Sequence, residues 1–112
     1  MIPEEAKKLF VAKFSSFGSD KFYKFLLNYA TNKIVANEDA KKENYKIDTV
    51  AVSPEIELMD YHDRFLILYR RENINVYLDI ARLFRKAAHK IYFVMLKKSM
   101  IEKNNKFLNL VE

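Results

Sequence analysis

The chain has 112 residues, of which half are apolar and 31% are charged, a length and balance that suit one domain with one hydrophobic core and exclude a disordered chain. It contains no cysteine, which excludes disulfides, thiolate zinc sites and a cysteine nucleophile and fits the reducing cytoplasm. The longest apolar run, residues 91–96, is far shorter than the roughly 20 residues that a membrane-crossing helix needs. We therefore expect a single cytoplasmic domain over residues 1–112 that does not span a membrane.

Two helices are predicted in the first 37 residues. Pro3 suits the first position of a helix, and Gly18 can adopt the left-handed conformation that ends one, so the first helix is expected over residues 3–17. A second helix is expected over residues 20–37, where apolar residues recur at helical spacing. Its stripe consists of Phe22, Leu26, Ala30 and Ile34.

The middle of the chain has the composition of strands. Residues 47–52 are rich in β-branched side chains, Pro54 interrupts them, and two further apolar segments follow at 55–61 and 64–71. The reversal between these two segments is placed at residues 62–63, although the glycine that strengthens a hairpin signal is missing there. Two or three antiparallel strands are therefore expected.

One long helix is predicted from residue 74 up to residue 102, because neither glycine nor proline interrupts this stretch. Its apolar residues fall within an arc of roughly 120°. The stripe consists of Val76, Tyr77, Ile80, Leu83, Phe84, Ala87, Ile91, Val94 and Met95. A buried strand over residues 91–96 is the competing interpretation. The predicted fold class is α+β, with two N-terminal helices, a two- or three-stranded antiparallel sheet and a long C-terminal helix packed on it.

The opposite face of this long helix is basic. Residues 74–112 carry eight Lys and Arg against three Asp and Glu, in a chain whose net charge is +5. Six of the basic side chains project within roughly 140° of one another. They are Arg82, Arg85, Lys86, His89, Lys90 and Lys97. A solvated helix face is the first interpretation, binding to nucleic-acid phosphates is the second, and contact with an anionic membrane surface is the third.

The C-terminal half of the same helix is apolar nearly all round. Tyr92, Phe93 and Leu96 lie on or beside the basic arc, so we expect something to cover them. Either the tail that contains Phe107 and Leu108 folds back over them, or they form an interface with a second copy or a partner protein.

Residues 21–25 alternate lysine with aromatic side chains, as a platform for single-stranded nucleic acid does. The helical stripe accounts for Phe22 and Tyr23 as core residues, which leaves Phe25 unexplained. Core packing is therefore the preferred interpretation of this segment.

Catalytic or metal chemistry has little support in the sequence. Residues 60–63, Asp-Tyr-His-Asp, are the only local cluster of groups able to perform acid–base or metal chemistry. With two histidines, no cysteine and one glycine, the chain lacks zinc-ligand spacing, a calcium loop and a glycine-rich phosphate loop. We therefore expect no cofactor and no metal. The leading hypothesis is a small non-catalytic interaction or regulatory module that self-associates, and the alternative is a nucleic-acid-binding module.

Overall fold

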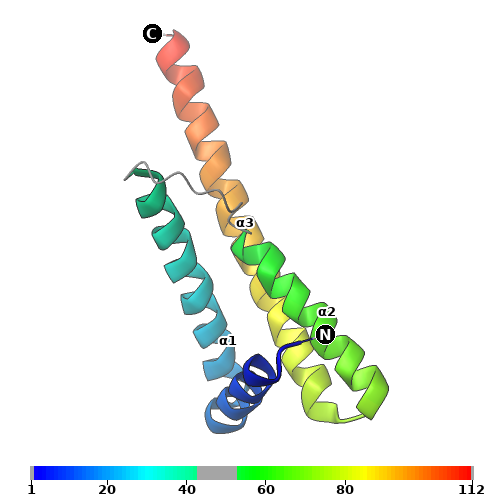
Figure 1. Cartoon of the computed structure of the whole chain (residues 1–112). Helices are drawn as coiled ribbons and strands as arrows, with labels where there is room; N and C mark the ends of the chain where they lie inside the picture. The colour runs from blue at the N-terminus through cyan, green and yellow to red at the C-terminus, as the bar shows by residue number, and fades with distance from the viewer. Residues whose placement is uncertain (1, 43–52, 112) are drawn as a thin grey trace.

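Three helices make up the part of the chain that the structure describes. The computed structural model describes the backbone of residues 2–42 and 53–111 and the side chains of residues 2–33 and 53–104. In chain order, α1 spans Glu4–Lys42, α2 spans Pro54–Glu72 and α3 spans Asn75–Val111. The molecule is elongated, 59 × 28 × 23 Å, and α3 runs along its length (Figure 1).

The predicted α+β fold is wrong, because no strand occurs in the described residues. Segments 55–61 and 64–71, together with the reversal predicted between them, all lie within α2. The predicted strand over residues 47–52 falls outside the described residues. The long C-terminal helix packs against the other two helices, most extensively against α2, and not against a sheet.

Local signals at both ends explain why α2 is a helix. Ser53 occupies the position before the helix, and Pro54 fits the first turn because it has no N–H to leave unpaired. At the other end, Asn73 adopts the left-handed conformation with φ 55°, and its N–H donates to the Tyr69 carbonyl at 2.7 Å. The buried residues of α2 are spaced four and seven apart, as a helix facing a core requires. They are Pro54, Leu58 and Phe65.

A kink at Gly18 divides α1 into two helical segments, which confirms the break that the sequence predicts there. Gly18 has φ 75° and ψ 178°, a combination that is essentially restricted to glycine because any side chain would be strained. The segment before Gly18 therefore turns away from the axis of the segment after it (Figure 1).

Aromatic rings around Phe84 of α3 form the centre of the core. Phe84 is completely buried, and its ring centroid lies 5.0 Å from that of Phe10 in α1 and 5.8 Å from that of Phe65 in α2. Phe22 of α1 and Tyr61 of α2 pack against the same ring at 6.0 and 5.4 Å. The Phe84 side chain of α3 thus contacts both other helices.

The prediction of one long C-terminal helix is confirmed, and the strand alternative over residues 91–96 is wrong. Buried residues recur along α3 at helical spacing and end at Ile91. Among residues 92–104 no side chain is fully buried, and only Met95 is half-buried. The first half of α3 therefore builds the core, whereas the second half extends beyond it.

Candidate functional site

The basic face of α3 comprises the six side chains predicted from the sequence, and all of them are exposed. They are Arg82, Arg85, Lys86, His89, Lys90 and Lys97. Within the described part of the chain, none of the six forms an ion pair with a carboxylate. Lys86 is held in another way, because its ammonium lies 4.6 Å from the ring centroid of Tyr23 in α1. The other five side chains are exposed to solvent.

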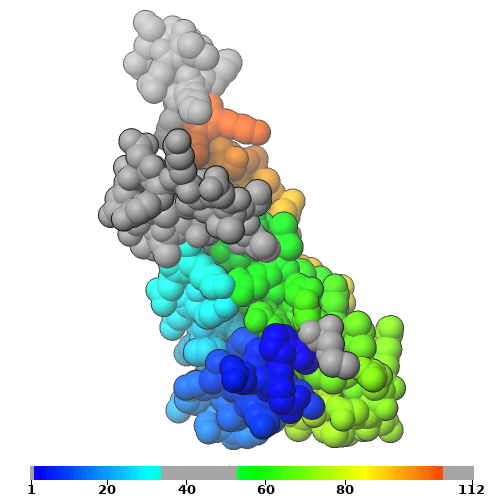
Figure 2. Space-filling view, in the orientation of Figure 1, coloured from blue at the N-terminus to red at the C-terminus, as the bar shows by residue number. Residues whose placement is uncertain are grey.

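An exposed apolar stripe continues this face toward the C-terminus. We define the apolar stripe as Phe93, Leu96 and Met100, whose spacing of three and four residues places them on one side of a helix. Their exposed fractions are 64%, 42% and 57%. Tyr92 flanks the stripe and is also half exposed. In the space-filling view this part of α3 lies beyond the body formed by α2 and the start of α1 (Figure 2).

Met100 was missed by the sequence reasoning, although the signal was present. It follows Phe93 by seven residues and Leu96 by four, so the same helical spacing that links the first two members includes it. Val94 and Ile101 are also half exposed, on the other flank of the helix. Exposed apolar surface therefore surrounds much of α3 after Ile91.

The C-terminal tail does not fold back over the apolar stripe. The backbone of residues 105–111, which contain Phe107 and Leu108, continues α3 as a helix up to Val111. The side chains of these two predicted interface residues lie outside the described residues. Because a continuous helix leads away from residues 92–100, the tail of the same chain cannot cover them.

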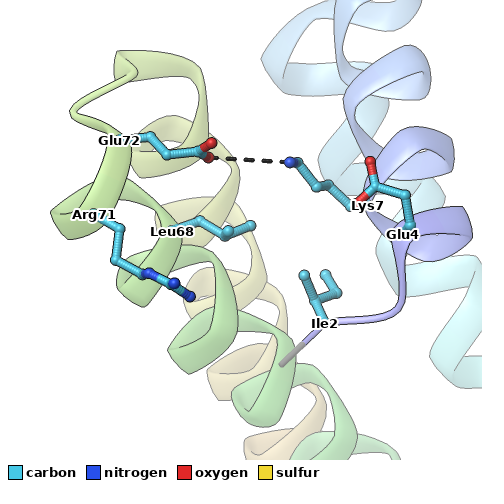
Figure 3. Close-up of a pocket in the computed structure, with 6 residues that line it drawn as sticks. All are labelled: Ile2, Glu4, Lys7, Leu68, Arg71 and Glu72. Atoms are coloured by element: carbon cyan, nitrogen blue, oxygen red, sulfur yellow. Dashed lines mark ion pairs between the residues drawn. The ribbon is translucent and has the colours of Figure 1, made fainter.

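A hollow of about 400 Å³ lies between the N-terminal segment and the end of α2 (Figure 3). Lys7 of α1 reaches across it toward Glu72 of α2, with 4.0 Å between nitrogen and oxygen. The pKa of Lys7 is raised overall, mainly by its hydrogen bond to the Tyr77 side chain. Burial lowers this pKa, and the charges of Glu4 and Glu72 raise it. Arg71 adds a second cation to the lining. Among the described lining residues, two cations and two carboxylates thus balance one another.

The acid–base cluster at residues 60–63 lies within α2 and not in the predicted reversal. Helical geometry separates the side chains of residues 60–63 around α2. His62 Nδ1 lies 2.9 Å from Asp63 Oδ1, while Asp60 accepts a hydrogen bond from Arg64 at 2.8 Å. Each acid is therefore engaged with its own neighbour. Among the described residues, no group of three His, Asp or Glu side chains is placed to hold a metal ion.

Comparisons with known proteins identify no related family or structure. The chain shows no significant match to any protein-family model, to any curated protein or to any solved structure. No helix in the described ranges is both long enough and apolar enough to cross a membrane. Function is therefore inferred from the fold and from the surfaces of α1 and α3.

Proposed function

We propose that this protein is a non-catalytic interaction module that pairs with a second copy of itself through the apolar stripe of α3. The exposure of Phe93, 64% in the middle of a helix, is the observation that carries the proposal. A large aromatic ring left in water on a regular helix gains free energy when a partner covers it. Most soluble oligomers are symmetric homo-oligomers, so a second copy is the simplest partner.

The spacing of the apolar stripe favours another helix as the surface that covers it. Phe93, Leu96 and Met100 stand at positions i, i+3 and i+7, the pattern by which one helix packs along another. The same stripe on a second copy supplies the matching helix. Tyr92, at the flank, adds an aromatic side chain of the kind enriched in interfaces.

The basic face sets the relative direction of the two helices. Lys86 and His89 precede Phe93 and Leu96 by seven residues, so they lie on the same side of α3. In a parallel pair, the two copies of Lys86 would face each other, and like charges in contact are repulsive. In an antiparallel pair they lie at opposite ends. We therefore propose an antiparallel pair.

Light scattering of the purified protein over a range of concentrations tests the proposal. A mass that rises from monomer to dimer supports it, whereas a monomer at millimolar concentration contradicts it. We keep the cytoplasm as the proposed location, because a chain without cysteine suits a reducing compartment.

Nucleic-acid binding by the basic face is the second candidate function. Its support is the group of exposed cations that have no carboxylate partner in the described residues, since such groups release counterions when they neutralise phosphates. Charge reversal at Arg82, Arg85 and Lys90 leaves the Lys86–Tyr23 contact intact and so spares the fold. Binding to mixed DNA or RNA at low salt that this triple variant abolishes would support the function. Absence of binding by the unaltered protein would rule it out.

A further inference from the structure

The kink in α1 creates a second surface, independent of α3. A shallow hollow of about 290 Å³ lies at Gly18, where the two segments of α1 meet. We call it the kink hollow. Its lining consists of Phe17, Lys21, Lys24, Phe25 and Asn28.

Two phenyl rings form the apolar part of the kink hollow. Phe17 comes from the segment before Gly18 and is 37% exposed, while Phe25 comes from the segment after it and is half-buried. Their ring centroids are 6.3 Å apart and their planes are inclined at 59°. Phe25 also packs against the core, with its ring centroid 6.2 Å from that of the completely buried Phe22, whereas Phe17 does not belong to the described core. The rings therefore form a V-shaped apolar notch that is open to solvent.

Lysines surround the notch. The Lys13 ammonium lies 5.2 Å from the centroid of Phe17 and 5.8 Å from that of Phe25. Lys21 and Lys24 belong to the lining and are both exposed. Among the described residues, no carboxylate belongs to the lining, and the neighbouring Asp20 is exposed outside it. The hollow thus combines an apolar notch with a positive rim.

We propose that the kink hollow binds an acidic peptide segment that carries one bulky apolar side chain. The apolar side chain fills the notch between Phe17 and Phe25, and flanking carboxylates pair with Lys21 and Lys24. Charge complementarity selects an acidic ligand, and the desolvated ring surface supplies the affinity.

The ring geometry favours a peptide over single-stranded nucleic acid. Nucleobases bind by stacking flat on successive ring faces. Because the planes of Phe17 and Phe25 are inclined at 59°, the two rings do not offer parallel faces on which successive bases of one strand could stack. A branched or aromatic side chain fills such a notch from above. The polar residues described in the lining are Lys21, Lys24 and Asn28, and none of them is arginine, the residue that forks onto phosphate oxygens.

Amide chemical shifts of the ¹⁵N-labelled full chain test the proposal. The probe is the synthetic peptide acetyl-Glu-Glu-Phe-Glu-Glu-amide, with a matched peptide that has alanine at its centre and a third in which lysine replaces every glutamate. We expect the first peptide to shift the amides of Phe17, Lys21, Lys24 and Phe25 and the other two to shift them at least about tenfold less at equal concentration. The double variant Lys21→Glu/Lys24→Glu should weaken binding at least about tenfold. Lys8→Glu, an exposed reversal outside the hollow, should not.

Three results would overturn the proposal. The first is the absence of shifts at millimolar peptide, and the second is equal binding by the unaltered chain and the double variant. The third is tighter binding of oligothymidine than of the peptide at the same amides, which would assign the kink hollow to single-stranded nucleic acid. Because both substituted lysines are exposed, the double variant should fold normally, and its amide spectrum verifies this directly.

Discussion

The hydroxyl of Tyr29 in α1 donates a hydrogen bond to the Glu57 carboxylate in α2 over 2.7 Å. The Lys33 ammonium binds the same carboxylate, with 2.8 and 2.7 Å to its two oxygens, and lies 4.7 Å from the Tyr29 ring centroid. This group ties α1 to α2, two helices that otherwise share few contacts. The Glu57 carboxylate thus bridges two helices that both pack on α3.

Stability should fall at alkaline pH because of this group. Burial raises the pKa of Tyr29, while the neighbouring Lys33 lowers it and Glu57 raises it. Burial lowers the pKa of Lys33, but its hydrogen bonds to Glu57 and Tyr29 outweigh this and raise it overall. Since both pKa values are raised on folding, the stabilisation is fully present below about pH 10 and is lost as the pH rises through the folded-state values.

Urea unfolding between pH 7 and pH 11 measures this contribution. Glu57→Gln should lower the free energy of unfolding at pH 7 by less than about 1 kcal/mol, because the Lys33 side chain is 42% exposed and solvent screens the pair. The variant should also lose less stability than the unaltered chain above pH 10. Glu102→Gln, an exposed carboxylate on α3, serves as the control. Parallel curves for all three proteins would contradict the assigned role of Glu57.

The kink in α1 should depend on Gly18 itself. Gly18→Ala should lower the free energy of unfolding by about 1–3 kcal/mol, because alanine is strained at φ 75° and ψ 178°. A clash would not be the cause, since nothing lies within 4 Å of the added Cβ. Ser19→Ala, at the adjacent exposed position, should change stability by less than about 0.5 kcal/mol. Equal stability of the two variants in urea unfolding would show that alanine is not strained at position 18.

Disulfide cross-linking tests the antiparallel arrangement, because the chain has no native cysteine. A disulfide forms only where two Cα atoms come within roughly 7 Å. The cysteine variants are Lys86→Cys, Phe93→Cys, Leu96→Cys and Met100→Cys. In an antiparallel pair, at least one of the last three should link to its copy, namely the one nearest the crossing point of the helices. Lys86→Cys should not link. A parallel pair would link all four variants. Linkage at position 86 would therefore refute the antiparallel arrangement and leave self-association intact.

The sequence was sufficient to predict α3 and the break at Gly18. The apolar residues of α3 recur at helical spacing over many turns without glycine or proline. Local preference and tertiary packing therefore both favour a helix. Gly18 is the only glycine of the chain, and its conformation is the one that glycine alone tolerates easily. The basic face followed from the same helical spacing, because five Lys and Arg side chains on one side of a helix cannot be buried together.

The strands predicted over residues 55–61 and 64–71 are wrong because composition and helical spacing conflict in this segment. The run from Phe65 to Tyr69 is rich in residues that suit strands. The helical start at Ser53 and Pro54 and the period from Leu58 to Phe65 were equally visible. Packing of Leu58 and Phe65 against α3 favours the helix, because tertiary burial outweighs the weak preferences of individual residue types.

The kink hollow could not be predicted from the sequence. Phe17 and Phe25 are eight residues apart on either side of a break, and the distance between their rings depends on the angle of the kink. No periodic rule gives that angle, because Gly18 interrupts the helical period on which such rules depend. The sequence offered two signals, the lysine–aromatic alternation of residues 21–25 and the unexplained position of Phe25.

Self-association through the apolar stripe is tested most directly by light scattering of Phe93→Glu beside Ile67→Glu. Both substitutions place a carboxylate on a helix surface where an apolar side chain is more than half exposed, 64% at Phe93 and 52% at Ile67, so neither should unfold the chain. Ile67 lies on α2, outside the stripe. We predict that the unaltered chain and Ile67→Glu are dimers and that Phe93→Glu is a monomer at the same concentration. A monomeric unaltered chain, or a Phe93→Glu variant that remains dimeric, would contradict the proposed function.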